Sequence, residues 1–501
     1  MAGSVKVRRG RVVALAVTAA AVGSLWWWAS ARNRRRLDHR GTTATVTHLV
    51  DRSSRSLALA RVGSRAGADL AVTTARVRFA SEERAAELRS DFELRTAEQV
   101  AEVLGNMKGA VMKLGQMASY LDQGLPEPVR EVLAQLQSDA PPMAPELAAD
   151  VVRRELGGEP ESIFAEWDPT PIAAASIGQV HRAVTKEGDR VAVKVQYPGV
   201  DDAIRADLDN SDLLFGAMGM LFPGLDPKPI VTELRDRLTE ELDYANEARH
   251  QHRFADYYRG HPTIHVPDVV RELSTPRVLT SELADGATFE ELTTWSQPER
   301  DLAAETIYRY AFGGIYRVGV FNGDPHPGNY LFHPGGRVTF LDYGLCKVFA
   351  ADEVAMFERL IRAMVFDHDI AAFARAAQEF GLLGDVDRFE EEQLFDYFRH
   401  FYDLVMFDES RSVTPEYASE SIRHYFDLTG PHAEILRNAN LPSSFVIIQR
   451  INLGLFALLA ELHATANWRR IAEEIWPWAD AEPSTPMGES IRDWERRRDA
   501  G

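Results

Sequence analysis

The chain has 501 residues, of which 45% are hydrophobic, and a formal net charge of −19 at pH 7. This length and apolar content can build one large core or two. The acidic body repels phosphate backbones, which excludes nucleic acid as a partner. The only cysteine, Cys346, excludes an intrachain disulfide and is expected to serve packing. The 14 histidines are scattered without the spacing of a zinc site.

Residues 1–40 differ from the rest of the chain, because they carry nine Lys or Arg and a single acid. Within them Val12–Ala31 has no charged residue, would span about 30 Å as a helix, and holds Trp26–Trp28 near its end. We therefore predict a transmembrane anchor in 1–40. The alternative is a cleaved secretory signal ending at Ala29-Ser30-Ala31, although the arginine-rich segment 32–36 that follows favours the anchor.

Residues 41–81 are typical of a linker followed by a first helix, and 82–144 have a helical pattern. From Leu104 to Leu121 apolar residues recur every three or four positions, which predicts an amphipathic helix with Lys113 and Gln116 near one another on its surface. Ala140-Pro141-Pro142 ends this helical region.

Residues 145–286 contain strand patterns around Val180, at Val191–Val195 and at Arg277–Ser281. Lys194 lies in the β-branched run Asp189–Val195, sixteen residues after Gly178, which is the spacing between a glycine-rich phosphate loop and the lysine of a kinase fold. In this loop alanine replaces the first two glycines, which predicts that nucleotide binds in an altered pose. The candidate nucleotide-binding residues of the loop are Ala173, Ala174, Ala175, Ser176, Gly178 and Val180.

A helical pattern follows over Thr232–Tyr258, and its Glu247 is the expected carboxylate partner of Lys194. Two further acids, Glu241 and Asp243, precede Glu247. The segment that begins at Glu282 and ends at Gly286 is predicted to be the hinge, where backbone groups meet adenine.

Residues 287–480 are predicted to be mainly helical, with an amphipathic helix over Leu302–Val318. After it, Asp324 precedes Asn329 by five residues, and Asp342-Tyr343-Gly344 ends an apolar run. This is the spacing with which a kinase-like fold holds a catalytic carboxylate and two metal-facing oxygens, and it predicts ATP or ADP with Mg²⁺.

Aromatic residues are frequent in Phe395–Phe407 and Trp468–Trp478. We expect both segments in the core, although an apolar lipid pocket would use the same side chains. Residues 481–501 have the composition of a polar tail.

Four elements together resemble the UbiB/AarF (ADCK) family of atypical kinases, over about residues 85–470. They are the segment Lys113-Leu114-Gly115-Gln116, the alanine-rich loop, Glu241-Leu242-Asp243 and Asp324–Asn329. The resemblance implies an α+β, bilobal protein-kinase-like fold with an N-terminal helical extension and helical C-terminal additions. Residues 145–286 would be the N-lobe and 287–480 the C-lobe.

The resemblance also implies residue roles. Asp324 would be the catalytic base, and Asn329 and Asp342 would hold magnesium. Lys113 and Gln116 would reach across the cleft towards Glu241 and Asp243, leaving little room for an extended polypeptide substrate.

The chain departs from the family pattern at three positions. Asn322 stands where the family usually has a histidine that braces the catalytic loop, and His250 stands where it has asparagine. Tyr343 replaces the phenylalanine of the metal motif and adds a hydroxyl that needs a partner.

The leading hypothesis is a membrane-anchored kinase or ATPase of the UbiB type that supports isoprenoid-lipid or quinone metabolism. Its expected partners are nucleotide, membrane and a prenyl lipid or quinone precursor, with the kinase-like body in the cytoplasm. The alternative is a catalytically inactive nucleotide-binding scaffold, which Asn322 and the loop alanines favour. A soluble sugar or antibiotic kinase predicts neither the Lys113–Gln116 segment nor the anchor, and a true protein kinase needs an open cleft.

Overall fold

The computed structural model describes residues 145–175, 177–200, 242–323, 325–383, 386–426, 432, 434–435, 452 and 454–500. All of these belong to one compact unit, Val62–Gly501. Several expectations therefore lie outside the described residues: the anchor, the linker, the helical extension with Lys113 and Gln116, and the residues Ser176, Glu241 and Asp324. No helix among the residues that the structure describes is long and apolar enough to cross a membrane.

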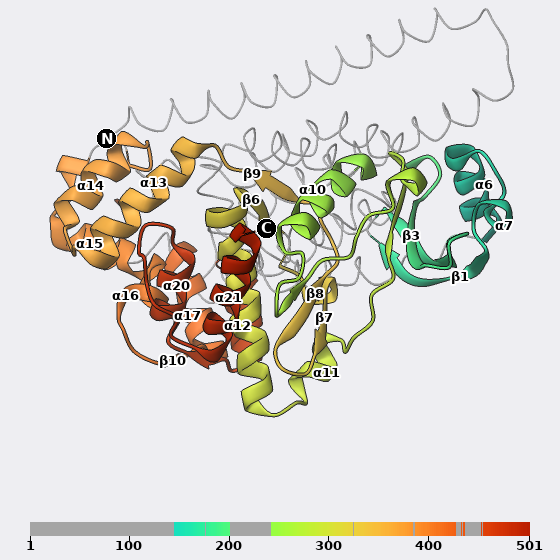
Figure 1. The fold of residues 1–501 in the computed structure, drawn as a ribbon. Coiled ribbons are helices and arrows are strands. Elements are labelled where there is room, and N and C mark those ends of the chain that lie inside the picture. Colours follow the sequence, from blue (N-terminus) through green and yellow to red (C-terminus); the bar gives the residue numbers. More distant parts are fainter. Residues whose placement is uncertain are drawn as a thin grey trace, which may run out of the picture. The chain divides into compact units, whose positions relative to one another are not determined.

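The N-terminal part is an antiparallel sheet of four strands in the order β1-β2-β3-β5 (Figure 1). Its strands are β1 (Glu166–Ala175), β2 (Gly178–Val184), β3 (Arg190–Gln196) and β5 (Val278–Glu282). Side chains of β3 alternate, so that Val191, Val193 and Val195 enter a small core together with helix α6 (Pro145–Leu156) and Phe164, which follows α7 (Pro160–Ile163). Lys194 points to the opposite face of the sheet.

Between β3 and β5 the chain forms α10 (Tyr244–Tyr257), the two-residue strand β4 (Ile264–His265) and η1 (Arg271–Leu273). Beyond β5 come α11 (Phe289–Thr293), α12 (Gln297–Gly313) and the π-helical turn η2 (Gly314–Val318). Two small sheets follow, β4-β8-β7 and β6-β9. The strands of these sheets not yet given are β6 (Val320–Asn322), β7 (Tyr330–His333), β8 (Arg337–Phe340) and β9 (Cys346–Val348), and the short helix η3 (Pro327–Asn329) lies between β6 and β7 in the chain.

The helix expected over Leu302–Val318 exists as α12 and η2, but the prediction that it is amphipathic was wrong. Every residue from Ala303 to Tyr310 is buried, including Glu305 and Arg309. Both charged side chains are buried because Arg309 pairs with Glu305 and with Glu474.

The C-terminal part is helical and encloses the largest hydrophobic core. Its helices are α13 (Ala351–Ile361), η4 (Arg362–Phe366), α14 (Ile370–Glu379), η5 (Val386–Arg388), α15 (Glu391–Phe398), η6 (Arg399–Phe401), α16 (Asp403–Met406), α17 (Pro415–Phe426), α20 (Trp468–Ile475) and α21 (Pro486–Ala500), and β10 (Arg411–Ser412) pairs with β11 (Thr465–Ala466). Tyr397, Phe398, Trp468 and Trp476 are buried, as expected for the two aromatic segments, but Phe407 at the end of the first is 51% exposed. Cys346 is a buried free thiol.

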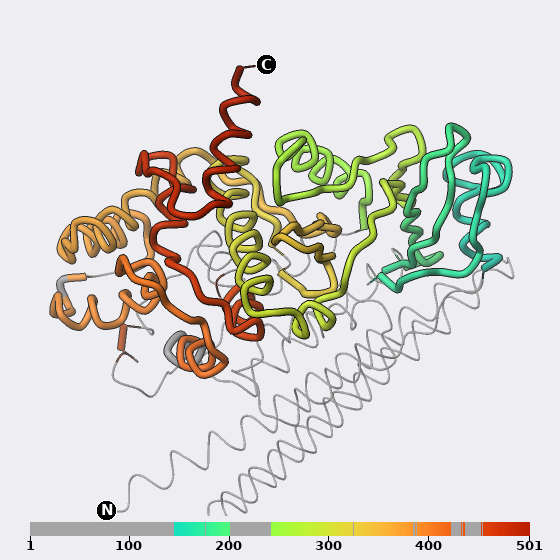
Figure 2. Tube along the Cα trace, turned by 60° about the horizontal axis from the view of Figure 1, so that its bottom comes forward, coloured from blue at the N-terminus to red at the C-terminus, as the bar shows by residue number. Residues whose placement is uncertain are grey.

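Residues 481–500 are not a free polar tail. They include helix α21, which buries Met487 and Trp494 against the rest of the unit. In the turned view of Figure 2 the end of α21 projects from the body, while its first turns lie beside it.

Candidate functional site

Three charged side chains meet on the inner side of the N-terminal sheet. Lys194 Nζ lies 2.8 and 3.0 Å from the two carboxylate oxygens of Glu247 and 3.3 Å from Asp342 Oδ2. Glu247 is only 4% exposed and the Lys194 side chain 16%. Burial acts to lower the pKa of Lys194, but Asp342 and Glu247 outweigh it and hold that pKa well above its usual value. The lysine is therefore charged and bridges two carboxylates.

The strand and helix that carry Lys194 and Glu247 explain why the two side chains lie close together. Strand alternation puts Lys194 opposite the buried valines of β3. Helix α10 begins directly after Asp243, whose carboxylate accepts from the backbone N–H of Ala245 as an N-cap. Glu247 therefore lies in the first turn of α10 and faces the sheet. Asp243, predicted to act across the cleft, has this capping role in the structure, while its predicted partners lie outside the described residues.

Tyr244 completes this cluster, and sequence reasoning missed it. The side chain is buried, and its ring centre lies 5.0 Å from Lys194 Nζ, within reach of a cation–π interaction. A Cβ at Gly178 would lie 2.8 Å from the Tyr244 hydroxyl and would overlap the carbonyl of Val195. Close packing therefore requires glycine at 178. The signal was a tyrosine three residues before Glu247, which places both on one helix face.

The alanine-rich loop is the hairpin between β1 and β2. Ala173 pairs with Val180, Ala174 with Gln179, and Ala175 with Gly178. Ala173 and Ala174 are exposed, while Ala175 and Val180 are partly buried. The three alanines belong to β1, the edge strand of the sheet, and their backbone pairs with β2. Their methyl groups therefore limit how the backbone of this edge strand can bend.

Asp342 is held on three sides. Its Oδ2 faces Lys194, its Oδ1 accepts from the backbone N–H of Gly344 at 2.9 Å, and its carbonyl accepts from Asn322 Nδ2 at 2.6 Å. Asn322 also donates to the Tyr310 hydroxyl at 3.3 Å. Asparagine at 322 thus supplies a brace to the metal motif.

Asn329 lies next to this motif, since its carbonyl accepts from the backbone N–H of Leu341 at 2.9 Å. The amide oxygen of Asn329 and the carboxylate of Asp342 are hard donors of the type that Mg²⁺ accepts. The described residues hold no cluster of three or more His, Cys, Asp or Glu suited to a metal. Magnesium at Asn329 and Asp342 would therefore need oxygens from nucleotide and water, as is usual for this ion.

Tyr343 is fully buried and its hydroxyl donates to the carbonyl of Phe340 at 3.2 Å. Its ring packs against Phe254 of α10 at 5.2 Å, and Phe254 also packs against Tyr310 at 5.5 Å. Burial raises the pKa of Tyr343 well above its usual value, so the hydroxyl stays neutral. The metal motif is thereby joined to α10 through aromatic contacts.

Glu282 ends β5 and begins the predicted hinge. Its carboxylate lies 3.4 Å from His265 Nε2, and both side chains are about half exposed. The hinge backbone stays attached to β3, because the N–H of Leu283 donates to the carbonyl of Arg190 at 3.0 Å.

The fold and this charge cluster define a kinase-like protein of the α+β class, as the sequence predicted. Comparison with known proteins then gives the family. The ABC1 atypical kinase-like domain matches residues 135–376. Over 394 residues the chain is 27% identical to the mitochondrial atypical kinase COQ8 of Saccharomyces cerevisiae, covering 76% of each chain.

Two further relatives differ in coverage. AarF domain-containing protein kinase 1 of Mus musculus is 33% identical over 287 residues, and the chain spans 54% of its length. The solved complex of Rv3197 with erythromycin from Mycobacterium tuberculosis has a TM-score of 0.57 and 32% identity, covering 79% of this chain and 99% of that one. The chain belongs to the UbiB/AarF family of atypical kinases.

Proposed function

We propose that the protein is an ATP-dependent atypical kinase or ATPase that binds Mg²⁺ and ATP or ADP between the N-terminal sheet and the segment of Asp342. The observation that carries this proposal is the bridge from Lys194 to both Glu247 and Asp342. Glu247 holds this buried lysine in one orientation, and the longer contact to Asp342, at 3.3 Å, is the one that a bound phosphate would replace.

The residues of the site would divide the work as follows. Glu247 orients Lys194, which binds the α and β phosphates. Asn329 and Asp342 would hold magnesium, and Asn322 fixes the backbone of Asp342. Bound magnesium would neutralise the charge that develops on the transferred phosphoryl group. Asp324, by family resemblance, would accept the proton of the attacking group.

The biological setting is a second part of the proposal. Membership of the UbiB type supports a role in isoprenoid-lipid or quinone metabolism, with a prenyl lipid or quinone precursor as partner. The uncharged stretch Val12–Ala31 would attach the protein to a membrane, with the kinase-like body in the cytoplasm. Fractionation of cells that express the full chain tests this point, because recovery in the supernatant after cell disruption would contradict it.

A thermal-shift titration with ATP or ADP, with and without Mg²⁺, tests the nucleotide site. Ligand at 100 times its dissociation constant adds about 2.7 kcal/mol of stability, which is a resolvable shift. We expect a magnesium-dependent shift that Asp342→Asn removes, followed by phosphate release from ATP. A shift without release would favour the inactive scaffold, and no shift at all would contradict both.

A macrolide is a second candidate ligand, because the Rv3197 structure that shares 32% identity is a complex with erythromycin. The same titration with erythromycin, in the presence and absence of ATP, tests this possibility directly. A shift with erythromycin that is additive with the ATP shift would place the macrolide at a separate site.

A further inference from the structure

Helix α21 packs against the far end of α10, the helix that carries Glu247. Trp494 is 5% exposed, and its Nε1–H donates to the carbonyl of Arg259 at 3.0 Å. Its ring makes an edge contact with His261 at 4.6 Å and lies within 6.5 Å of Tyr258. Gly260 has a φ of 69°, a turn that favours glycine and that ends α10 beside Trp494.

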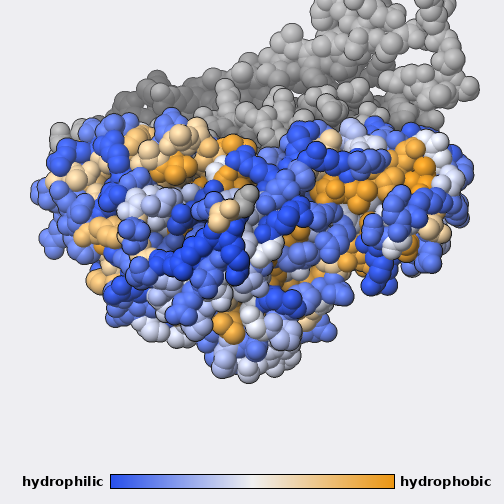
Figure 3. Space-filling model, in the orientation of Figure 1, coloured by the Kyte–Doolittle hydropathy of each residue, from blue (hydrophilic) through white to orange (hydrophobic). Residues whose placement is uncertain are grey.

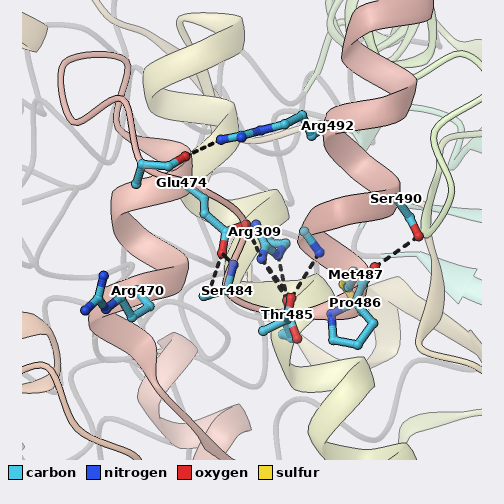
Figure 4. A network of polar contacts seen from close by, with 12 residues as sticks. Arg309, Arg470, Glu474, Ser484, Thr485, Pro486, Met487, Ser490 and Arg492 are labelled. Atoms are coloured by element: carbon cyan, nitrogen blue, oxygen red, sulfur yellow. Dashed lines mark hydrogen bonds and ion pairs between the residues drawn. The ribbon is translucent and has the colours of Figure 1, made fainter.

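The first turn of α21 rests on the buried charges of α12. Arg309 pairs with Glu305 and Glu474 at 2.8 Å each, and Thr485 donates to Glu305 at 2.6 Å. Figure 4 shows Arg309, Glu474 and Thr485 converging at the start of α21. A Cβ at Gly488 would overlap the Glu474 carboxylate, so the helix approaches this network as closely as its backbone allows.

Between these two attachments α21 borders a cavity. A cavity of about 310 Å³, lined mainly by polar side chains such as Arg317, Glu473 and Arg492, lies among α10, α12 and α21. The outer face of α21 is hydrophilic (Figure 3). The helix is therefore attached at its first turn and at Trp494, and between them only the partly buried Ile491 packs against the core.

The position of Trp494 matters for Glu247 because Trp494 contacts one end of the continuous helix α10 and Glu247 lies at the other. Ten residues separate Glu247 from Tyr257, which is about 15 Å at 1.5 Å per residue. Gln251 and Arg253 also tie the middle of α10 to the carbonyls of Pro267 and Val318, at 2.8 and 2.6 Å. A tilt of about 10° around this middle point would move Glu247 by about 1 Å over the roughly 6 Å from Gln251, enough to break a hydrogen bond to Lys194. Phe254, between the two ends, packs on Tyr343 of the metal motif, so the same tilt would disturb both sides of the site.

We propose that α21 is a clamp that fixes α10 to α12, and that Trp494 is a positioning residue for the Lys194–Glu247 pair. This inference rests on the proposed nucleotide site, which it deepens. In this proposal α21 holds the Lys194–Glu247 pair in place although it contacts neither Lys194, Glu247 nor Asp342.

The test compares two matched substitutions in the full chain. Trp494→Phe and Trp468→Phe each remove an indole N–H that donates to a backbone carbonyl at 3.0 Å, but Trp468 donates to Arg411, away from α10. Amide hydrogen exchange over 244–257 without nucleotide, and the KM and kcat for ATP, are measured for both. We expect faster exchange in α10 and a KM raised about fivefold for Trp494→Phe alone, as the loss of one hydrogen bond of about 1 kcal/mol implies.

Equal effects of the two substitutions, or exchange in α10 that Trp494→Phe leaves unchanged, would overturn the clamp. If Trp494→Phe does not fold, Gly488→Ala displaces the other attachment and carries the same expectation. If the wild-type chain binds no nucleotide, the proposed function fails, while the exchange measurement still decides whether α21 holds α10.

Discussion

Asn322 donates a hydrogen bond of 2.6 Å to the backbone carbonyl of Asp342, twenty residues further along the chain. The two residues lie on either side of the predicted catalytic loop, and Tyr310 adds a second partner for the same amide group. The departure from histidine at 322 therefore replaces one donor by another, which weakens the argument for an inactive scaffold.

Asn322→Leu should weaken nucleotide binding in the presence of Mg²⁺ and leave binding without Mg²⁺ almost unchanged. The substitution removes the donor to the Asp342 carbonyl, at a cost of about 1–3 kcal/mol if that group stays buried. Isothermal titration with ATP, with and without Mg²⁺, measures the difference. Asn322→His is the control, because it keeps a donor, and equal losses in both variants would contradict the brace.

Lys194→Met should destabilise the protein at pH 7 by about 3–5 kcal/mol, because Glu247 would remain buried without its cation. The change would raise the folded-state pKa of Glu247 above its unfolded value, so the lost stability should return partly as the pH falls below that raised pKa. Urea unfolding at pH 7 and pH 5 measures this. Adding Glu247→Gln to Lys194→Met should restore stability at pH 7, and a further loss would show that the pair is not coupled.

Gly178→Ala should cost about 1–3 kcal/mol of stability, since the new methyl group would overlap the Val195 carbonyl and press on the Tyr244 hydroxyl. Thermal unfolding without nucleotide measures this cost apart from any effect on phosphate. Ala174→Gly, at an exposed position of the same hairpin, serves as the comparison and should cost no more than about 1 kcal/mol. A neutral Gly178→Ala would mean that the hairpin shifts to accept the methyl group.

Acid should destabilise the protein through His261. Burial, and then the charges of Arg309 and Arg498, lower the pKa of this imidazole to about 3 from 6.5. Its Nδ1 also accepts from the backbone N–H groups of Thr263 and Ile264.

Below pH 6.5 the unfolded chain therefore binds a proton at His261 that the folded chain rejects. The contribution of His261 to the free energy of unfolding is present in full above pH 6.5. It falls by at most about 1.4 kcal/mol per pH unit between pH 6.5 and 3. His261→Asn keeps an acceptor without this titration, so denaturant unfolding from pH 7 to 4.5 should show a shallower slope. An unchanged slope would assign acid sensitivity to other groups.

Local patterns predicted much of the site. The strand alternation of β3 set the direction of Lys194, and short motifs around Glu247 and Asp342 identified its partners, although these lie 53 and 148 residues away. The Lys194–Glu247 ion pair that these motifs predict is present in the structure. Each of these motifs is recognised from a few neighbouring residues, which a single sequence records.

The remaining features depend on contacts between distant segments. The helix α12 was predicted to be amphipathic, but Arg309 is buried because its partner Glu474 comes 165 residues later. The segment 481–501 is polar apart from a few side chains, and only its packing reveals that Trp494 is an anchor point. The role of Tyr244 depends on its packing against Gly178, which is 66 residues earlier and which the sequence alone does not place beside it.

The bond from Trp494 to Arg259 spans 235 residues. At a synthesis rate of about 5–20 residues per second, α10 would leave the ribosome roughly 10 to 50 seconds before its partner helix exists. During this interval Tyr257 and Tyr258 lack the cover that Trp494 gives them, so a chaperone that binds aromatic segments could bind there. The arrival of α21 ends this interval by covering the two tyrosines.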